Sequence, residues 1–260
     1  MNYKVSSSLG LMALSGILVL IGAIPLSNSV LVCGFGLLII CYYLAWQEKP
    51  LIKHLAWIFT ILLGFFTATY RPSDFSYPLV WDFTGSGIEF QLHINTAKTI
   101  CGYLILIWFL QSASKFRLSL HSAFTLSVCS AVLVILSLAA INGVAFLPKL
   151  PGGIILFAIV NLFTTVVAEE AFFRLLIQKK VSELFQREMT GTVVSILVAS
   201  TIFAFAHVPK PSLAFLTFFI AGAVYATVYR VTNRFSMALV CHFTVNIIHF
   251  SLFEYPLVIR

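Results

Sequence analysis

Long apolar runs, separated by short polar connectors, make up most of the chain. At a rise of 1.5 Å per residue, a helix of about 20 apolar residues crosses the hydrocarbon core of a bilayer. The third and fourth runs are short, so the pattern predicts eight or nine spans. Because backbone groups in lipid must be satisfied internally and these runs are too uniformly apolar for barrel strands, we expect an all-α, polytopic transmembrane helix bundle. The runs cover residues 9–26, 29–46, 55–70, 99–112, 122–147, 154–178, 191–207, 212–229 and 235–253.

Composition supports an integral, multi-pass membrane protein that contacts the lipid bilayer. Hydrophobic residues make up 60% of the chain and charged residues 10%, whereas a soluble domain has about a quarter of its residues charged. The net charge of +7 is better explained by membrane topology than by a nucleic-acid partner, because lysine and arginine concentrate on the cytoplasmic side. The first run resembles a signal peptide but lacks a convincing cleavage site, so we expect it to be retained as a span.

The basic residues also indicate an orientation. With nine spans and a cytoplasmic N-terminus, ten of them fall inside and five outside, which agrees with the positive-inside rule. We therefore expect a protein of the bacterial inner membrane with its N-terminus in the cytoplasm. The long outer loop 71–98 is rich in aromatic residues and is expected to lie on the membrane surface. The inner set is Lys4, Lys49, Lys53, Lys115, Arg117, Lys179, Lys180, Arg187, Arg230 and Arg234, and the outer set is Arg71, Lys98, Lys149, Lys210 and Arg260.

Three ionisable residues interrupt the sixth apolar run: Glu169, Glu170 and Arg174. A charged side chain inside a span costs roughly 2.5 to 3.5 kcal/mol on insertion scales, so such residues are usually paired and functional. Glu170 and Arg174 are four residues apart and should share one helix face, whereas Glu169 should point about 100° away. A buried ion pair that fixes helix packing would explain Glu170 with Arg174, but it would leave Glu169 unexplained.

Polar residues recur in two later runs. His207 ends the seventh, and the ninth contains His242 and Asn246, four residues apart on one face. Singly, each could be a side chain that hydrogen-bonds between helices. His249 continues the face of His242, and we interpret it as a packed or interfacial histidine. The five cysteines show no paired or metal-binding spacing and are interpreted as small apolar side chains.

A carboxylate, two histidines and an amide gathered in one membrane cavity are suited to peptide hydrolysis. The carboxylate can take a proton from water while a histidine holds that water, and the remaining donors can stabilise the oxyanion. The chain has no Gly-x-Ser-x-Gly elbow, no His-Glu-x-x-His pair and no Walker loop.

The ordered motifs resemble a known family. Glu169-Glu170-x-x-x-Arg174, Phe203-x-x-x-His207 and His242-x-x-x-Asn246 follow one another on three polar-bearing spans. Each motif alone has little specificity, but the ordered set resembles the CPBP family of intramembrane proteases, also called the CAAX-processing or Abi type. The resemblance covers about residues 150 to 253. It implies a catalytic core in 151–260, preceded by N-terminal spans in 1–150 whose role is unassigned.

What the resemblance implies is a glutamate-dependent endopeptidase. Glu169 would be the general base and His207 its partner on the water. His242 and Asn246 would form the oxyanion site, while Glu170 and Arg174 would orient the cluster and balance its charge. A site without metal or other cofactor is expected, and the alternative is a zinc ion held by the glutamate and the histidines.

The substrate would be a peptide or protein with a membrane-associated segment: a prenylated CAAX tail, a leader peptide or a sorting helix. The competing function is a non-catalytic immunity protein or small-solute carrier on the same scaffold. One geometric difficulty is the position of His207. If its span begins at Gly191, His207 lies sixteen residues along it, too far across the membrane to meet Glu169 and His242.

Overall fold

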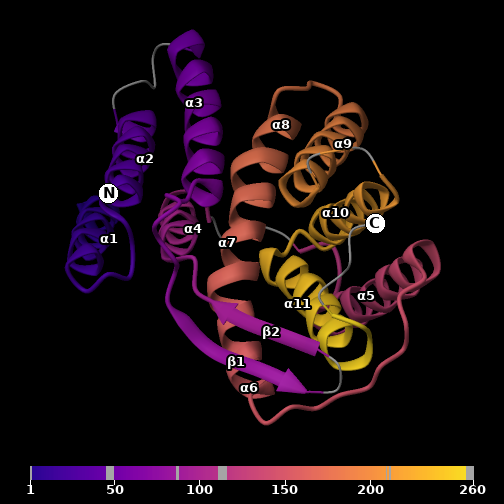
Figure 1. Cartoon of the computed structure of the whole chain (residues 1–260). Coiled ribbons are helices and arrows are strands. Elements are labelled where there is room, and N and C mark those ends of the chain that lie inside the picture. Colours follow the sequence, from indigo (N-terminus) through magenta and orange to yellow (C-terminus); the bar gives the residue numbers. More distant parts are fainter. Residues whose placement is uncertain are drawn as a thin grey trace. The chain divides into compact units, whose positions relative to one another are not determined.

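The computed structural model describes residues 2–44, 50–85, 88–110, 116–208, 210 and 212–255. Lys49, Lys115 and Arg260, which entered the topology prediction, lie outside the described residues. The described part is helical apart from one hairpin, as Figure 1 shows. Its first helices are α1 (Asn2–Leu20), α2 (Leu26–Leu44), α3 (Pro50–Thr69), α4 (Thr96–Phe109) and α5 (Leu120–Asn142), and the last three are α9 (Glu188–His207), α10 (Leu213–Thr232) and α11 (Phe235–Leu252).

The prediction of an all-α membrane bundle is confirmed. Among the described residues, eight helices are long and apolar enough to cross a membrane. Helix α4, which corresponds to the fourth predicted run, is not among these eight. It has 14 residues and is therefore only about 21 Å long. Its start is fixed by Asn95, whose side chain accepts a hydrogen bond from the Lys98 amide. The predicted count of eight or nine spans thus depends on whether α4 is counted.

The span that carries the glutamates is a continuous but irregular helical run of 30 residues, Ile154–Glu183. Two π-helical segments interrupt it, one on each side of the glutamates. π-helical turns inside α-helices are rare and are frequent at functional sites. The run consists of α6 (Ile154–Val160), the π-helix η1 (Asn161–Val166), α7 (Val167–Glu170), the π-helix η2 (Ala171–Gln178) and α8 (Lys179–Glu183).

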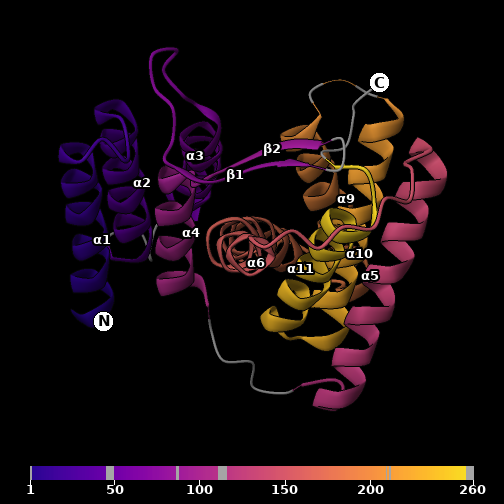
Figure 2. The ribbon, with the colours of Figure 1, turned by 60° about the horizontal axis from the view of Figure 1, so that its bottom comes forward.

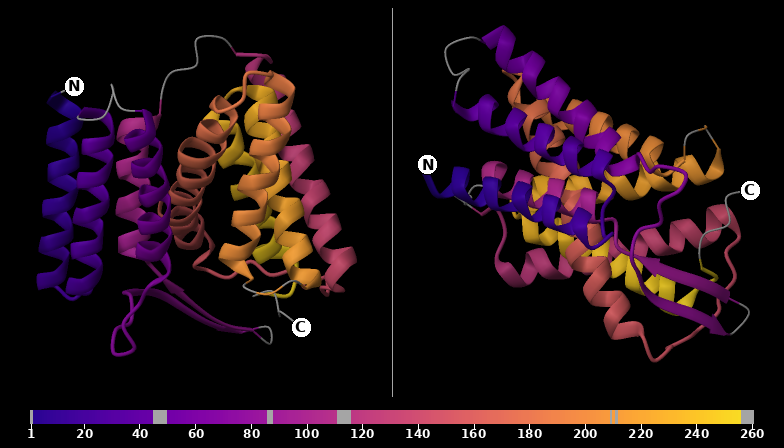
Figure 3. Two further views of the ribbon diagram at one scale, coloured as in Figure 1. Left: turned by 90° about the horizontal axis from the view of Figure 1, so that it is seen from above. Right: turned by 60° about the vertical axis from the view of Figure 1, so that its left-hand side comes forward.

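The chain forms two compact units that do not follow sequence order. The first comprises 1–80, 93–110 and 163–172. In this unit α4 packs against α1, α2, α3 and α7, and α2 packs against α1 and α3; Figure 3 shows these N-terminal helices side by side. Asn28 of α2 donates hydrogen bonds to the Tyr70 carbonyl and to the Tyr77 hydroxyl. These bonds connect α2 to the segment that follows α3. Burial raises the pKa of Tyr77 to about 12, so this phenol stays protonated.

The second unit comprises 81–92, 111–162 and 173–260. In it α10 packs against α5, α9 and α11, and α11 packs against α5. Gly222 allows close contact between α10 and α9, since a Cβ there would lie 3.2 Å from both the Phe203 side chain and the Ser200 Cα. Small residues at helix crossings permit this kind of packing in membranes.

The segment between α3 and α4 contains a two-stranded hairpin of β1 (Leu79–Gly85) and β2 (Ile88–His93), visible in Figure 2. Its Trp81 and Phe90 rings lie 6.1 Å and 5.4 Å from the Phe250 ring of α11. Phe250 in turn stacks on Phe157 at 4.1 Å. These aromatic side chains therefore have partners within the protein, and membrane contact is not needed to explain them. That the loop lies on the membrane surface stays a prediction.

Candidate functional site

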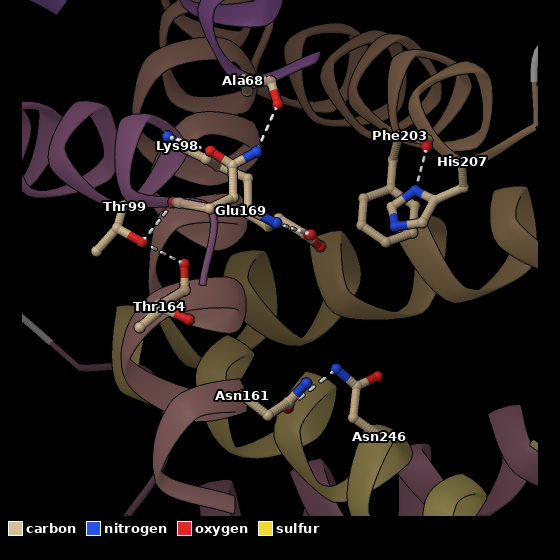
Figure 4. A network of polar contacts seen from close by, with 10 residues as sticks. Ala68, Lys98, Thr99, Asn161, Thr164, Glu169, Phe203, His207 and Asn246 are labelled. Atoms are coloured by element: carbon tan, nitrogen blue, oxygen red, sulfur yellow. Dashed lines mark hydrogen bonds and ion pairs between the residues drawn. The ribbon is translucent and has the colours of Figure 1, made fainter. Parts of the chain in front are cut away.

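Glu169 lies in α7 and forms an ion pair with Lys98 of α4, within the first unit. Lys98 Nζ is 2.9 Å from Glu169 Oε1, and the two side chains are 24% and 13% exposed. Figure 4 shows this contact. From the sequence, Lys98 was interpreted as a loop charge that contributes to topology, and its pairing was not predicted. The sequence did offer one signal of a missing cation. The sixth run contains two glutamates and a single arginine, so its charges do not balance.

The position of Lys98 follows from the close packing of α4 on the glutamate-bearing helix. A Cβ on Gly102, one turn after Lys98, would lie 2.5 Å from the Ala168 Cα. Only a glycine therefore allows the backbone of α4 to approach the residue that precedes Glu169. Without a side chain at this point, Lys98 can reach the carboxylate.

Side chains of α4 also bind the backbone of η1. Thr99 Oγ1 donates to the Thr164 carbonyl at 3.3 Å, and the Tyr103 hydroxyl donates to the Phe163 carbonyl at 3.2 Å. Irregular helix inside a membrane is tolerated where side chains satisfy the freed backbone groups. The hydroxyl groups of α4 thus stabilise the π-helical segment that leads into Glu169.

Glu170 and Arg174 are both fully buried. Arg174 NH1 donates to Gln178 Oε1 at 3.2 Å, and Gln178 Nε2 donates to the Ala226 carbonyl of α10 at 2.9 Å. The expected shared face of Glu170 and Arg174 was derived from the α-helical period. Because a π-helix begins at Ala171, that period does not apply between them. Their pairing stays a prediction.

His207 is the last residue of α9, in the second unit. Its Nδ1 donates to the Phe203 carbonyl at 2.8 Å. A carbonyl can only accept, so this bond places the proton of the neutral imidazole on Nδ1 and leaves Nε2 as an acceptor. The ring also stacks on Phe218, with centroids 4.6 Å apart, and these contacts fix its orientation.

His242 of α11 and His207 of α9 both lie against the Phe203 ring. The His242 ring stacks on Tyr225 with centroids 4.5 Å apart. The Phe203 ring lies 5.8 Å from His242 and 4.4 Å from His207. Counting residues along the spans had predicted that His207 lies too far across the membrane to meet His242. This difficulty is removed for the pair, because helices that tilt and begin at different levels can bring together residues at different distances from their span ends.

Asn246, one turn after His242, bonds to Asn161, a residue that was not predicted from the sequence to belong to the site. Its Nδ2 donates to Asn161 Oδ1 at 3.1 Å (Figure 4). Asn161 is buried and is the first residue of η1. This contact uses one of the two amide hydrogens of Asn246 and holds the carboxamide in a fixed orientation. A lone asparagine in an apolar run was the only local sign of Asn161.

His249 was interpreted from the sequence as a packed or interfacial histidine, and the cysteines as small apolar side chains. His249 is buried near Tyr255, at 5.2 Å between rings, which agrees with a packed histidine. None of the five cysteines, all of which lie in the described residues, forms a disulfide. Among the residues that the structure describes, no group of three or more histidine, cysteine, aspartate or glutamate side chains is arranged to hold a metal ion.

The candidate residues thus form two local groups. Glu169 with Lys98 belongs to the first unit, and His207, His242, Asn246 and Asn161 belong to the second. The continuous helical run from Ile154 to Glu183 carries members of both. That the two groups act as one site stays a prediction.

Comparison with known proteins finds a similarity in the C-terminal part of the chain. Residues 151–248 match the family model described as type II CAAX prenyl endopeptidase Rce1-like. The resemblance to the CPBP proteases is confirmed, and it covers the segment that contains all three motifs. No curated protein and no solved structure matches the chain.

Proposed function

We propose that this chain, whose residues 151–248 match a family of CAAX-type endopeptidases, is an intramembrane endopeptidase in which Glu169 activates water. The observation that carries the proposal is the position of the three motifs, which all fall inside the matched segment. The contacts of the individual residues support it. His207 has an oriented ring with Nε2 as acceptor, and Asn246 has an oriented amide.

In the proposed reaction the Glu169 carboxylate removes a proton from water as the water oxygen attacks the carbonyl carbon of the scissile peptide bond. His207 Nε2 accepts the second hydrogen of that water in a hydrogen bond and so orients it. The carbonyl oxygen becomes an oxyanion, to which His242 and Asn246 donate hydrogen bonds. When the C–N bond breaks, the proton held by Glu169 passes to the leaving amine, and the carboxylate is restored.

The proposed substrate is a peptide or protein with a membrane-associated segment, such as a CAAX tail, a leader peptide or a sorting helix. The test is a comparison of membrane-protein termini in cells with the wild-type protein and with Glu169→Gln. We expect at least one new terminus, next to an apolar or lipidated segment, that requires Glu169. Identical sets of termini would favour the non-catalytic immunity or carrier function.

We further propose that hydrolysis needs no metal ion, because the side chains supply both a base and oxyanion donors. Activity in detergent is expected to survive strong chelators, with no stoichiometric zinc in elemental analysis. Glu169, His207 and His242 are the side chains that would hold zinc in the alternative site. Activity that is lost with chelators and restored only by added zinc would establish that alternative.

The proposed orientation places the N-terminus in the cytoplasm, on the basis of the ten and five basic residues on the two sides. Reporter fusions after Lys115 and within the hairpin segment 84–91 should then report opposite sides of the membrane. Reporters on the same side would show that the assignment of the first spans is wrong.

A further inference from the structure

Lys98 lies outside the segment that matches the peptidase family. It belongs to α4, 71 residues before Glu169 in sequence, in the N-terminal part to which no role has been assigned. Its ammonium group nevertheless contacts the proposed catalytic base directly, at 2.9 Å from Oε1. Both side chains are mostly shielded from solvent.

The contact is part of a larger attachment of α4 to this helix. One side of α4 packs against the stretch from Phe163 to Glu169. It presents two pairs of neighbouring residues, one helical turn apart: Lys98 with Thr99, and Gly102 with Tyr103. Gly102 touches Ala168 closely, and the two hydroxyl groups bind carbonyls of η1. Helix α4 therefore contributes to the position of the Glu169 carboxylate.

We propose that Lys98 is a positioning residue that holds Glu169 as an oriented, ionised base; this inference rests on the proposed function. An isolated carboxylate in apolar surroundings loses its charge unless a cation compensates it. The Lys98 ammonium supplies that charge at Oε1. With its charge held in this way, the carboxylate can accept the proton of the attacking water. The N-terminal helices thereby contribute to catalysis without contacting the substrate.

The first test is Lys98→Met, which keeps an unbranched chain of similar length and removes the charge. We expect kcat to fall about 10²-fold, the size of effect that a small misplacement of a catalytic group produces. KM should change little, because Lys98 contacts Glu169 and is not proposed to contact the substrate. The matched control is Lys53→Met, which removes a lysine of the same unit that lies over the Tyr42 ring, and it should retain wild-type kcat.

Chemical rescue separates the charge from packing. In Lys98→Cys, alkylation with 2-bromoethylamine displaces bromide and creates a thioether side chain with an ammonium at the position of the lysine nitrogen. Alkylation with iodoacetamide creates a neutral adduct of similar length. We expect only the ammonium adduct to restore kcat. Wild-type protein treated in the same way corrects for reaction at the five native cysteines.

The outcomes distinguish this inference from the proposed function. Loss of turnover in Glu169→Gln together with wild-type kcat in Lys98→Met would overturn the role of Lys98 and leave the peptidase intact. Rescue by both adducts, or by neither, would show that Lys98 acts through packing and would likewise overturn it. Full turnover in Glu169→Gln would instead remove the proposed function itself.

Discussion

Glu169→Gln is expected to abolish nearly all turnover and leave the fold intact. Glutamine has the same shape as glutamate, and its Oε1 can still accept a hydrogen bond from Lys98. Its amide cannot take a proton from water, so the step that creates the nucleophile is lost. The measurement is single-turnover hydrolysis together with thermal unfolding, both in one detergent.

The loss of turnover in Glu169→Gln can be compared with the effects of two further variants. Asn246→Ala should lower kcat by about 10²- to 10³-fold, the typical cost of one oxyanion donor. Glu170→Gln should lower thermal stability as well as rate, because loss of the predicted pair would leave the fully buried Arg174 cation without its counter-charge. If Glu169→Gln were correctly folded and retained ordinary turnover, Glu169 would have no role as a base.

Gly102→Ala is expected to destabilise the protein and to lower kcat. The added Cβ would lie 2.5 Å from the Ala168 Cα and 2.6 Å from its Cβ. Because neither atom can rotate away, α4 must shift, and overpacking of this kind typically costs about 1–3 kcal/mol. The shift would also move Lys98 away from Glu169. Thermal unfolding and kcat, measured on the same preparation, test both effects.

Gly16→Ala is the matched control for this substitution. Gly16 also lies within a helix of the first unit, but a Cβ there meets nothing within 4 Å. Alanine favours a helix over glycine by about 0.5–1 kcal/mol, so this variant should be at least as stable as the wild type. Equal stability of Gly102→Ala and Gly16→Ala would contradict the close packing of α4 on α7.

Several features of this protein could be predicted from sequence because they depend on local properties. Uninterrupted apolar runs require helices in lipid, and the spans α5, α9, α10 and α11 lie close to the predicted runs. The spacing of His242 and Asn246 places both on one face of α11, a regular α-helix. The three motifs are likewise local, and for that reason they sufficed to show the resemblance to the CPBP family.

The tertiary structure alone decided which distant groups meet. Lys98 pairs with Glu169 across 71 residues, and Asn161 pairs with Asn246 across 85. The Phe203 ring contacts both His207 and His242, although their positions along their spans predicted that they would be far apart. The π-helical turns around the glutamates were also missed, since an i,i+4 spacing assumes a regular helix. These features depend on how helices tilt and how closely their backbones approach, and small residues such as Gly102 set that approach through packing that local periodicity does not encode.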